Sequence, residues 1–341
     1  MVSQNTTVTD DWNRWFKWAN RFDQAMAFSF YGLIFFLPIS IAMVEWFTGL
    51  SLLFFILKRG CHFRILFQED GSRKKSASNL YRLFVQAFNL PSTSLNPWVW
   101  YWCGICLFSS FFSPFFKVSL IGFLGKILQN VFLFFNFYEA IRDRKRINAF
   151  IGVWCFSVGL IVISGLVQYF TGEDFLRHRI VEDGRLSSSL RAPNDFGVYL
   201  VTIFPFLITS VMQMFAPREN GVPFQQPGIK RSILKIALPI FLIALVICIG
   251  LTFSRGSWLA CGMCLAFMVF QDKKLVKWVL PMGGVFFVVF TMKMLDDRSH
   301  ANMLSLLSTF GRSSYWREGF NMLRDYPLTG VGINAYSLVG R

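Results

Sequence analysis

Long apolar runs without charged residues dominate this chain. Four of these runs contain no Asp, Glu, Lys or Arg: residues 97–116, 149–171, 196–216 and 236–254. Each has close to the roughly 20 residues that a helix needs to cross the hydrocarbon core of a bilayer. We therefore predict one transmembrane helix in each run.

Weaker runs raise the predicted number of crossings to nine. Three of them predict one crossing each: residues 118–138, 257–270 and 275–294. Residues 25–57 carry a single charge and are too long for one crossing, so Pro38 and the 45–49 stretch predict a hairpin of two short helices. The expected fold class is an all-α, polytopic membrane helix bundle.

Composition and charge support this class. The chain is 54% hydrophobic and only 16% charged, which excludes disorder and most soluble enzymes. The net charge of +15 would suggest nucleic acid in a soluble protein. With nine crossings, however, 21 cations fall on the side of the N-terminus and 12 on the other. The positive-inside rule then places the N-terminus in the cytoplasm, with the bilayer and not nucleic acid as partner.

The predicted topology divides the chain into three parts. Residues 1–24 form an aromatic and basic cytoplasmic segment, expected as an amphipathic interfacial helix, with a disordered tail as the alternative. Residues 25–294 form the transmembrane bundle, with a basic cytoplasmic loop at 58–96 and a loop at 172–195 on the opposite side of the membrane. Residues 295–341 begin a large loop on that opposite side.

The cations on the outer side are mostly arginines. Ten of the 12 are Arg, whereas the inner cations divide almost evenly between Arg and Lys. Anchoring to a membrane does not distinguish the two residue types, but the planar guanidinium binds phosphate or carboxylate oxygens in bidentate fashion. This bias favours an anionic substrate such as a lipid-linked pyrophosphate; ordinary surface arginines are the alternative.

One arginine stands out by its position. Arg255 lies in residues 252–258, which join two apolar crossings with almost no loop. A charge at this depth is expensive unless it faces a polar cavity. Gly256 would permit a tight turn and Ser257 could cap the following helix, whose N-terminal amides would add positive potential. These residues predict an anion site, with a snorkelling arginine as the alternative.

Neither the cysteines nor the histidines predict a metal or cofactor. Six of the seven cysteines fall inside apolar runs, including the closely spaced pairs at 103/106 and 261/264, which we interpret as packing residues. The three histidines fall in separate loops without a second ligand at metal-binding spacing.

Four short motifs together resemble a known family. They are P-N at 193–194, S-R-G-x-W at 254–258, G-R-x-x-x-W at 311–316 and P-L-x-G-V-G at 327–332. In this order and topology, residues 25–341 resemble the O-antigen ligase and O-antigen polymerase superfamily. The resemblance implies a metal-independent glycosyltransferase of the bacterial inner membrane, with the loops at 172–195 and 295–341 in the periplasm. Such enzymes transfer a glycan from undecaprenyl pyrophosphate to a lipid A core sugar, to a growing polysaccharide or, in some branches, to a protein.

The resemblance also implies roles for particular residues. Arg255 and Arg312 match the two arginines that hold the donor pyrophosphate. Residues that could support them are Arg191, Asn194, Ser254 and Trp316. The family's general base is a histidine that follows the P-L-x-G-V-G motif, and no histidine follows that motif up to Arg341, since His300 precedes it. We therefore expect a fragment of a longer protein, and enzymatic activity of this chain stays open.

Two other classes of function remain as alternatives. A membrane transporter, such as a bicarbonate-type relative, could use Lys126 and Glu45, which lie inside predicted crossings, to line a path. A non-catalytic membrane scaffold is the third possibility.

Overall fold

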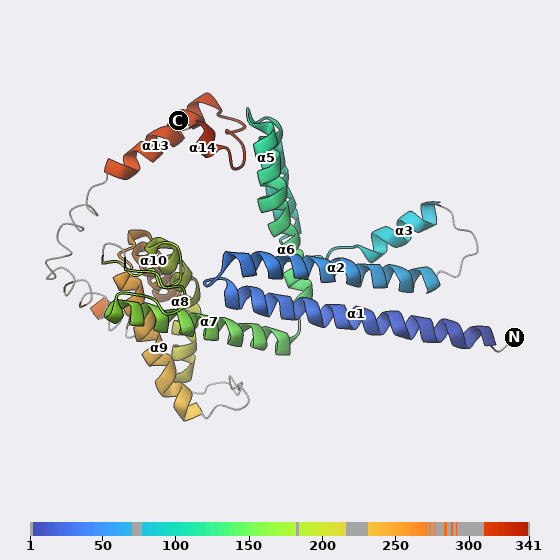
Figure 1. Ribbon diagram of the computed structural model, residues 1–341, viewed down its shortest axis with the longest axis horizontal. Helices are drawn as coiled ribbons and strands as arrows, with labels where there is room; N and C mark the ends of the chain where they lie inside the picture. The colour runs from blue at the N-terminus through green and yellow to red at the C-terminus, as the bar shows by residue number, and fades with distance from the viewer. Residues whose placement is uncertain are drawn as a thin grey trace. The chain divides into compact units, whose positions relative to one another are not determined.

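The computed structural model describes residues 3–69, 77–181, 184–215, 231–271 and 310–339, with isolated positions between 273 and 291. These residues form helices and no β-strand (Figure 1). The chain divides into two compact units. Unit 1 comprises Met1–Ile34, Ala42–Val153 and Thr309–Arg341, and unit 2 comprises Phe35–Ile41 and Trp154–Ser308.

The first two helices form the predicted hairpin, with its bend at Pro38. Helix α1 (Ser3–Phe36) continues from the expected interfacial segment into the first predicted crossing without a break, and α2 (Ile41–Glu69) follows after a short turn. Proline ends α1 because it cannot donate a backbone hydrogen bond. The break predicted at 45–49 was wrong, because these residues lie inside α2.

The other helices of unit 1 come from the middle and the end of the chain. They are α3 (Ala77–Ala87), α4 (Asn96–Phe111), α5 (Phe116–Gly122), the π-helical turn η1 (Phe123–Leu128), α6 (Gln129–Ala140), α13 (Phe310–Asp325) and α14 (Tyr336–Val339). One apolar cluster of this unit gathers around Met26, Phe30 and Phe55, and another around Phe123 and Phe135.

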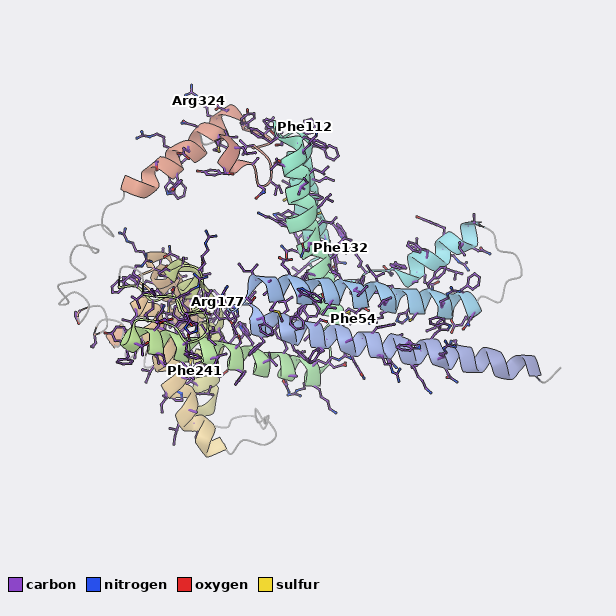
Figure 2. All side chains as sticks on the ribbon, in the orientation of Figure 1. Phe54, Phe112, Phe132, Arg177, Phe241 and Arg324 are labelled. Carbon is purple, nitrogen blue, oxygen red and sulfur yellow. The ribbon has the colours of Figure 1, made fainter. Side chains whose placement is uncertain are left out.

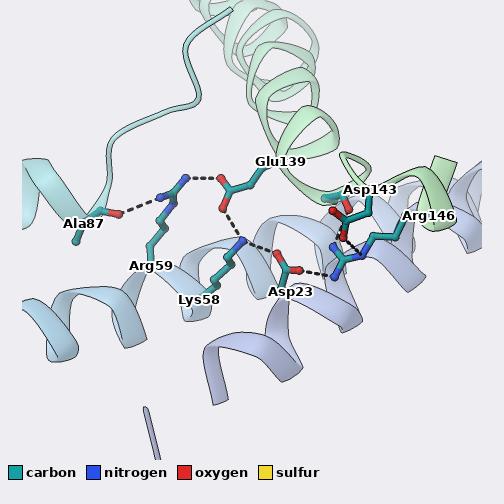
Figure 3. Close-up of polar contacts among 8 residues, drawn as sticks. Asp23, Lys58, Arg59, Ala87, Glu139, Asp143 and Arg146 are labelled. Carbon is teal, nitrogen blue, oxygen red and sulfur yellow. Dashed lines mark hydrogen bonds and ion pairs between the residues drawn. The ribbon is translucent and has the colours of Figure 1, made fainter. Parts of the chain in front are cut away.

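A buried ion network ties α1, α2, α6 and α7 together in unit 1 (Figure 3). Lys58 Nζ lies 2.5 Å from Asp23 Oδ1 and 2.6 Å from Glu139 Oε1. Arg59 also pairs with Glu139, and Arg146 Nη2 lies 2.5 Å from Asp23 Oδ2. Burial alone would raise the pKa of the Asp23 carboxyl, but its contacts with Lys58 and Arg146 outweigh burial and lower that pKa.

Unit 2 is built around one large apolar core. It comprises most of α7 (Arg144–Thr171), a loop at 172–192, α8 (Pro193–Phe215), α9 (Arg231–Leu251) and α10 (Arg255–Gln271). Close packing of α7 and α8 depends on Gly165, where an added Cβ would lie 3.0 Å from the fully buried ring of Phe196. Small residues of this kind let apolar helices approach closely, as in membrane proteins.

Four helical segments in the described part of the chain are long and apolar enough to cross a membrane. They are Ile41–Glu69, Phe116–Ala140, Arg144–Thr171 and Pro193–Met212; Lys235–Leu251 is apolar but shorter. Helix α4 ends at Phe111, earlier than predicted, because Pro114 follows. The prediction of an all-α membrane-type fold is confirmed, whereas the number nine stays a prediction. The crossing predicted at 275–294 lies mostly, and His300 entirely, outside the described residues.

Candidate functional site

A tight turn in unit 2 places Arg255 at the start of a helix. The turn joins α9 to α10, and Phe253 adopts the left-handed region with φ 51°. Thr252 Oγ1 donates to the Ile249 carbonyl at 2.7 Å and accepts the Ser254 N–H at 3.2 Å. The indole N–H of Trp258 donates to the same carbonyl at 3.1 Å. The sharp bend predicted at Gly256 therefore occurs at Phe253, because local hydrogen bonds hold the backbone there.

The cap of α10 is Ser254, not Ser257 as predicted. Ser254 Oγ accepts the Ser257 N–H at 3.4 Å and the Ser257 hydroxyl at 3.0 Å, and both serines are buried. Arg255 is thus the first residue of the helix, where the backbone amides concentrate positive potential. Its side chain is exposed, and among the described residues it forms no hydrogen bond or ion pair.

Arg185 connects this turn to the start of α8. Its Nε donates to the Thr252 carbonyl at 2.9 Å, and its Nη2 donates to Asn194 Oδ1 at 2.9 Å. Helix α8 begins at Pro193, because proline fits the first helical position. Both of these acceptors are neutral, so neither cancels the charge of the guanidinium. The sequence shows Arg185 near the P-N motif but not its contact with residue 252.

The loop that carries Arg185 is fastened to α7 by two buried polar side chains. Asp174 accepts the Ser164 hydroxyl at 2.8 Å and backbone N–H groups that include that of Arg179. Gln168 donates to the Arg179 carbonyl at 3.0 Å and accepts the Ser188 N–H at 2.8 Å. Sequence analysis missed both residues, although a Gln at the end of an apolar helix and an Asp just beyond it were visible signals.

The loop presents other basic side chains on its surface. Arg191, three residues before Asn194, is exposed and has no ion-pair partner in the described part of the chain. Arg177, labelled in Figure 2, is also exposed and donates to the Ile39 carbonyl at 3.1 Å. Arg191, Asn194, Ser254 and Arg255 therefore all belong to unit 2, and Arg185 links two of the segments that carry them.

The other two predicted site residues belong to unit 1. Arg312 lies in the first turn of α13, and Trp316 follows one turn later with its side chain exposed. The helix ends at Asp325, two residues before Pro327. Whether Arg312 and Arg255 hold one ligand together stays a prediction.

The P-L-x-G-V-G motif packs against α4 and the segment that leads into α5. Ser109 Oγ donates to the Thr329 carbonyl at 2.5 Å, and Ser113 Oγ donates to the Val331 carbonyl at 2.7 Å. Gly332 has φ 94°, and an added Cβ would lie 2.1 Å from Ser119 Oγ. The last glycine of the motif is therefore required by both backbone conformation and space.

The apolar helices of membrane-crossing length indicate a helical membrane protein. The capped turn at Arg255, which has no acidic partner in the described part of the chain, is its candidate anion site. Residues 240–340 match the family model described as O-antigen ligase, and this match supports the predicted resemblance to the O-antigen ligase superfamily. The match includes Arg255, Arg312 and Trp316 but not Arg191 or Asn194. No curated protein matches the chain, and no solved structure does.

Proposed function

We propose that this chain belongs to an O-antigen ligase-like glycosyltransferase and binds its glycan donor. It would act on the periplasmic side of the inner membrane, with a cytoplasmic N-terminus. The donor is a glycan linked to undecaprenyl pyrophosphate, and the acceptor is a lipid A core or a growing polysaccharide. The observation that carries the proposal is Arg255: an exposed guanidinium without a described acidic partner, at a capped helix N-terminus inside the matched segment.

The reaction requires charge stabilisation on the leaving group. The acceptor hydroxyl attacks the anomeric carbon of the glycan, a new C–O bond forms, and the bond from that carbon to the pyrophosphate oxygen breaks. The electron pair leaves with undecaprenyl pyrophosphate, and the acceptor proton passes to a base. Arg255 and Arg312 would stabilise the developing negative charge, so the step needs no metal.

The surrounding contacts support a fixed position for Arg255. Ser254 caps the helix, and Arg185 holds the turn to α8 through Thr252 and Asn194. A guanidinium whose backbone is fixed before the ligand arrives loses little entropy on binding. Arg191 would add positive potential from the neighbouring loop.

Glycan transfer and donor binding in membranes containing the chain test the role of Arg255. We expect Arg255→Ala to slow glycan transfer about 10²–10³-fold, as removal of one oxyanion donor does in other enzymes. The same substitution should weaken donor binding. Arg255→Lys should also be impaired, because the ammonium cannot bind in bidentate fashion. Lys235→Ala, which removes an exposed cation near the other end of α9, is the control. Wild-type donor binding by Arg255→Ala would remove the assignment.

Arg312 is tested in the same assays with a control on its own helix. Arg312→Ala should weaken donor binding, whereas Arg324→Ala, in the last turn of α13, should leave it unchanged. Equal effects of the two substitutions would show that α13 contributes only general positive charge.

A further inference from the structure

A lysine inside a candidate membrane span meets the segment that contains the P-L-x-G-V-G motif. Lys126 lies in η1, the π-helical turn within Phe116–Ala140. Its Nζ donates to Asn334 Oδ1 at 2.7 Å, across 208 positions in the sequence. This contact joins a part of the chain outside the family match to residue 334 inside it.

Small residues bring the two segments together at this point. Ser119, Gly122 and Lys126 are spaced to lie on one helix face. A Cβ added at Gly122 would lie 3.0 Å from Asn334 Cβ and 3.2 Å from Ile333 Cγ2, so the glycine permits close approach. The segment from Thr329 to Asn334 therefore packs along α4, α5 and η1, and its last residue contacts Lys126.

The charge of Lys126 is not balanced within the described residues. An ammonium has three donor hydrogens, and the contact with Asn334 uses one of them on a neutral oxygen. Glu45, another charge in a predicted crossing, accepts from Gln129 Nε2 at 3.3 Å. Lys126 is exposed, so a ligand can reach it. An ionised side chain at such a position is costly and usually marks a functional site.

The backbone on both sides of the contact departs from regular geometry. Lys126 lies in a π-helical turn, a rare element that occurs often at functional sites. Asn334 adopts the left-handed region with φ 64°. A residue held in this region costs energy that the surrounding structure must compensate. The hydrogen bond between Lys126 and Asn334 therefore joins two backbone segments of unusual geometry.

We propose that Lys126 binds the phosphate groups of the lipid-linked donor, with Asn334 positioning its ammonium. The proposal rests on the proposed function and adds a donor contact on a helix outside the family match. The ammonium acts as a compact point charge toward a phosphate oxygen, which complements the bidentate contact expected of an arginine.

Donor binding by the whole 341-residue chain tests the proposal. The purified protein is placed in nanodiscs of neutral phosphatidylcholine and titrated with polyprenyl pyrophosphate, with the uncharged polyprenol and inorganic pyrophosphate as comparison ligands. We expect Lys126→Met to weaken polyprenyl pyrophosphate binding about 10–100-fold, as loss of a hydrogen bond to a charged group does. Lys126→Arg should recover part of the affinity, and polyprenol binding should not change.

Asn334→Ala separates ligand binding from a structural role. This substitution removes the same hydrogen bond but leaves the ammonium, so we expect a much smaller loss than in Lys126→Met. Equal losses in the two variants would overturn the proposal, because Lys126 would then only fasten the segment. Association with phosphatidylglycerol is measured in the same variants. If Lys126→Met loses this association as strongly as it loses polyprenyl pyrophosphate binding, the proposal is overturned in favour of a general lipid headgroup site.

The same titration distinguishes failure of this inference from failure of the proposed function. A wild-type chain that does not bind polyprenyl pyrophosphate would overturn both. Wild-type binding that Lys126→Met retains would overturn the role of Lys126 alone. Loss of binding in Lys126→Met together with normal binding in Arg255→Ala would remove Arg255 from the site and leave Lys126 in it.

Discussion

Two groups of basic residues in this protein differ in what neutralises them. In unit 1, Lys58, Arg59 and Arg146 each pair with the carboxylate of Asp23 or Glu139. In unit 2, Arg255 and Arg191 are exposed and, within the described residues, have no acidic partner. The residue types are the same, but only the second group leaves its charge available to a ligand.

Burial explains why the first group must be paired. Only 7% of the Lys58 side chain is exposed, and a buried charge without a partner is strongly unfavourable. A cation at a surface turn remains hydrated and needs no partner in the absence of ligand. Paired cations therefore contribute mainly to the fold, and unpaired ones are the candidates for anion binding.

Removal of Lys58 should give the largest loss of stability. Lys58→Met leaves two buried carboxylates with one cation fewer, and breaking a buried pair costs about 3–5 kcal/mol. We expect a matching fall in the free energy of unfolding of the purified protein in detergent. Lys17→Met, an exposed lysine on α1 without a described partner, is the control and should change little. Equal stability of the two variants would contradict the structural role of the network.

Loss of Arg185 should have a smaller effect on stability but a clear effect on binding. Arg185→Ala removes hydrogen bonds to Thr252 and Asn194, and at this half-exposed position each should contribute about 0.5–1.5 kcal/mol, the net value of a typical hydrogen bond. We expect weaker donor binding as well, because the turn before Arg255 loses its link to α8. Arg177→Ala on the same loop is the control. Normal donor binding by Arg185→Ala would separate this link from the candidate site.

Local sequence patterns predicted much of the fold. Apolar runs of membrane-crossing length located α7, α8 and α9, because a charge-free stretch has few other stable arrangements. Pro193 and Pro38 marked a helix start and a helix end, since proline acts on its own backbone and its neighbours. These signals require no knowledge of distant contacts.

Distant contacts account for what the sequence did not predict. The basic loop was expected to begin at residue 58, but helix α2 continues through this position to Glu69. Lys58 is held there by Asp23 and Glu139, which lie 35 and 81 positions away in the sequence. The candidate arginine was identified by its short turn, but Arg185, which holds that turn, acts across 67 positions. Spacing alone could not choose between Ser254 and Ser257 as the cap, since both flank the helix start.

Low pH should reduce the stability of unit 1 through protonation of Asp23, which lies outside the candidate membrane spans. Its pKa is lowered in the folded protein, so its stabilising contribution is complete above the unfolded-state pKa of about 4 and is lost as pH falls through the folded-state value. One proton changes the unfolding free energy by at most about 1.4 kcal/mol per pH unit. Thermal unfolding between pH 7 and pH 3 should show a shallower dependence in Asp23→Asn than in the wild type. Asp143→Asn, whose carboxylate is mostly exposed, should keep the wild-type dependence.

The smallest change in stability is expected at Arg191, and it gives the sharpest contrast with the ion network. Arg191→Ala removes an exposed side chain, and such substitutions usually change the unfolding free energy by less than about 0.5 kcal/mol. Donor binding should still weaken by about 0.2–1 kcal/mol, as for other exposed charge pairs. High salt should abolish this difference in binding, because ions screen exposed charges. A loss of stability above about 1 kcal/mol would instead place Arg191 with the cations that hold the fold, since a residue free to meet a ligand has no such contribution to lose.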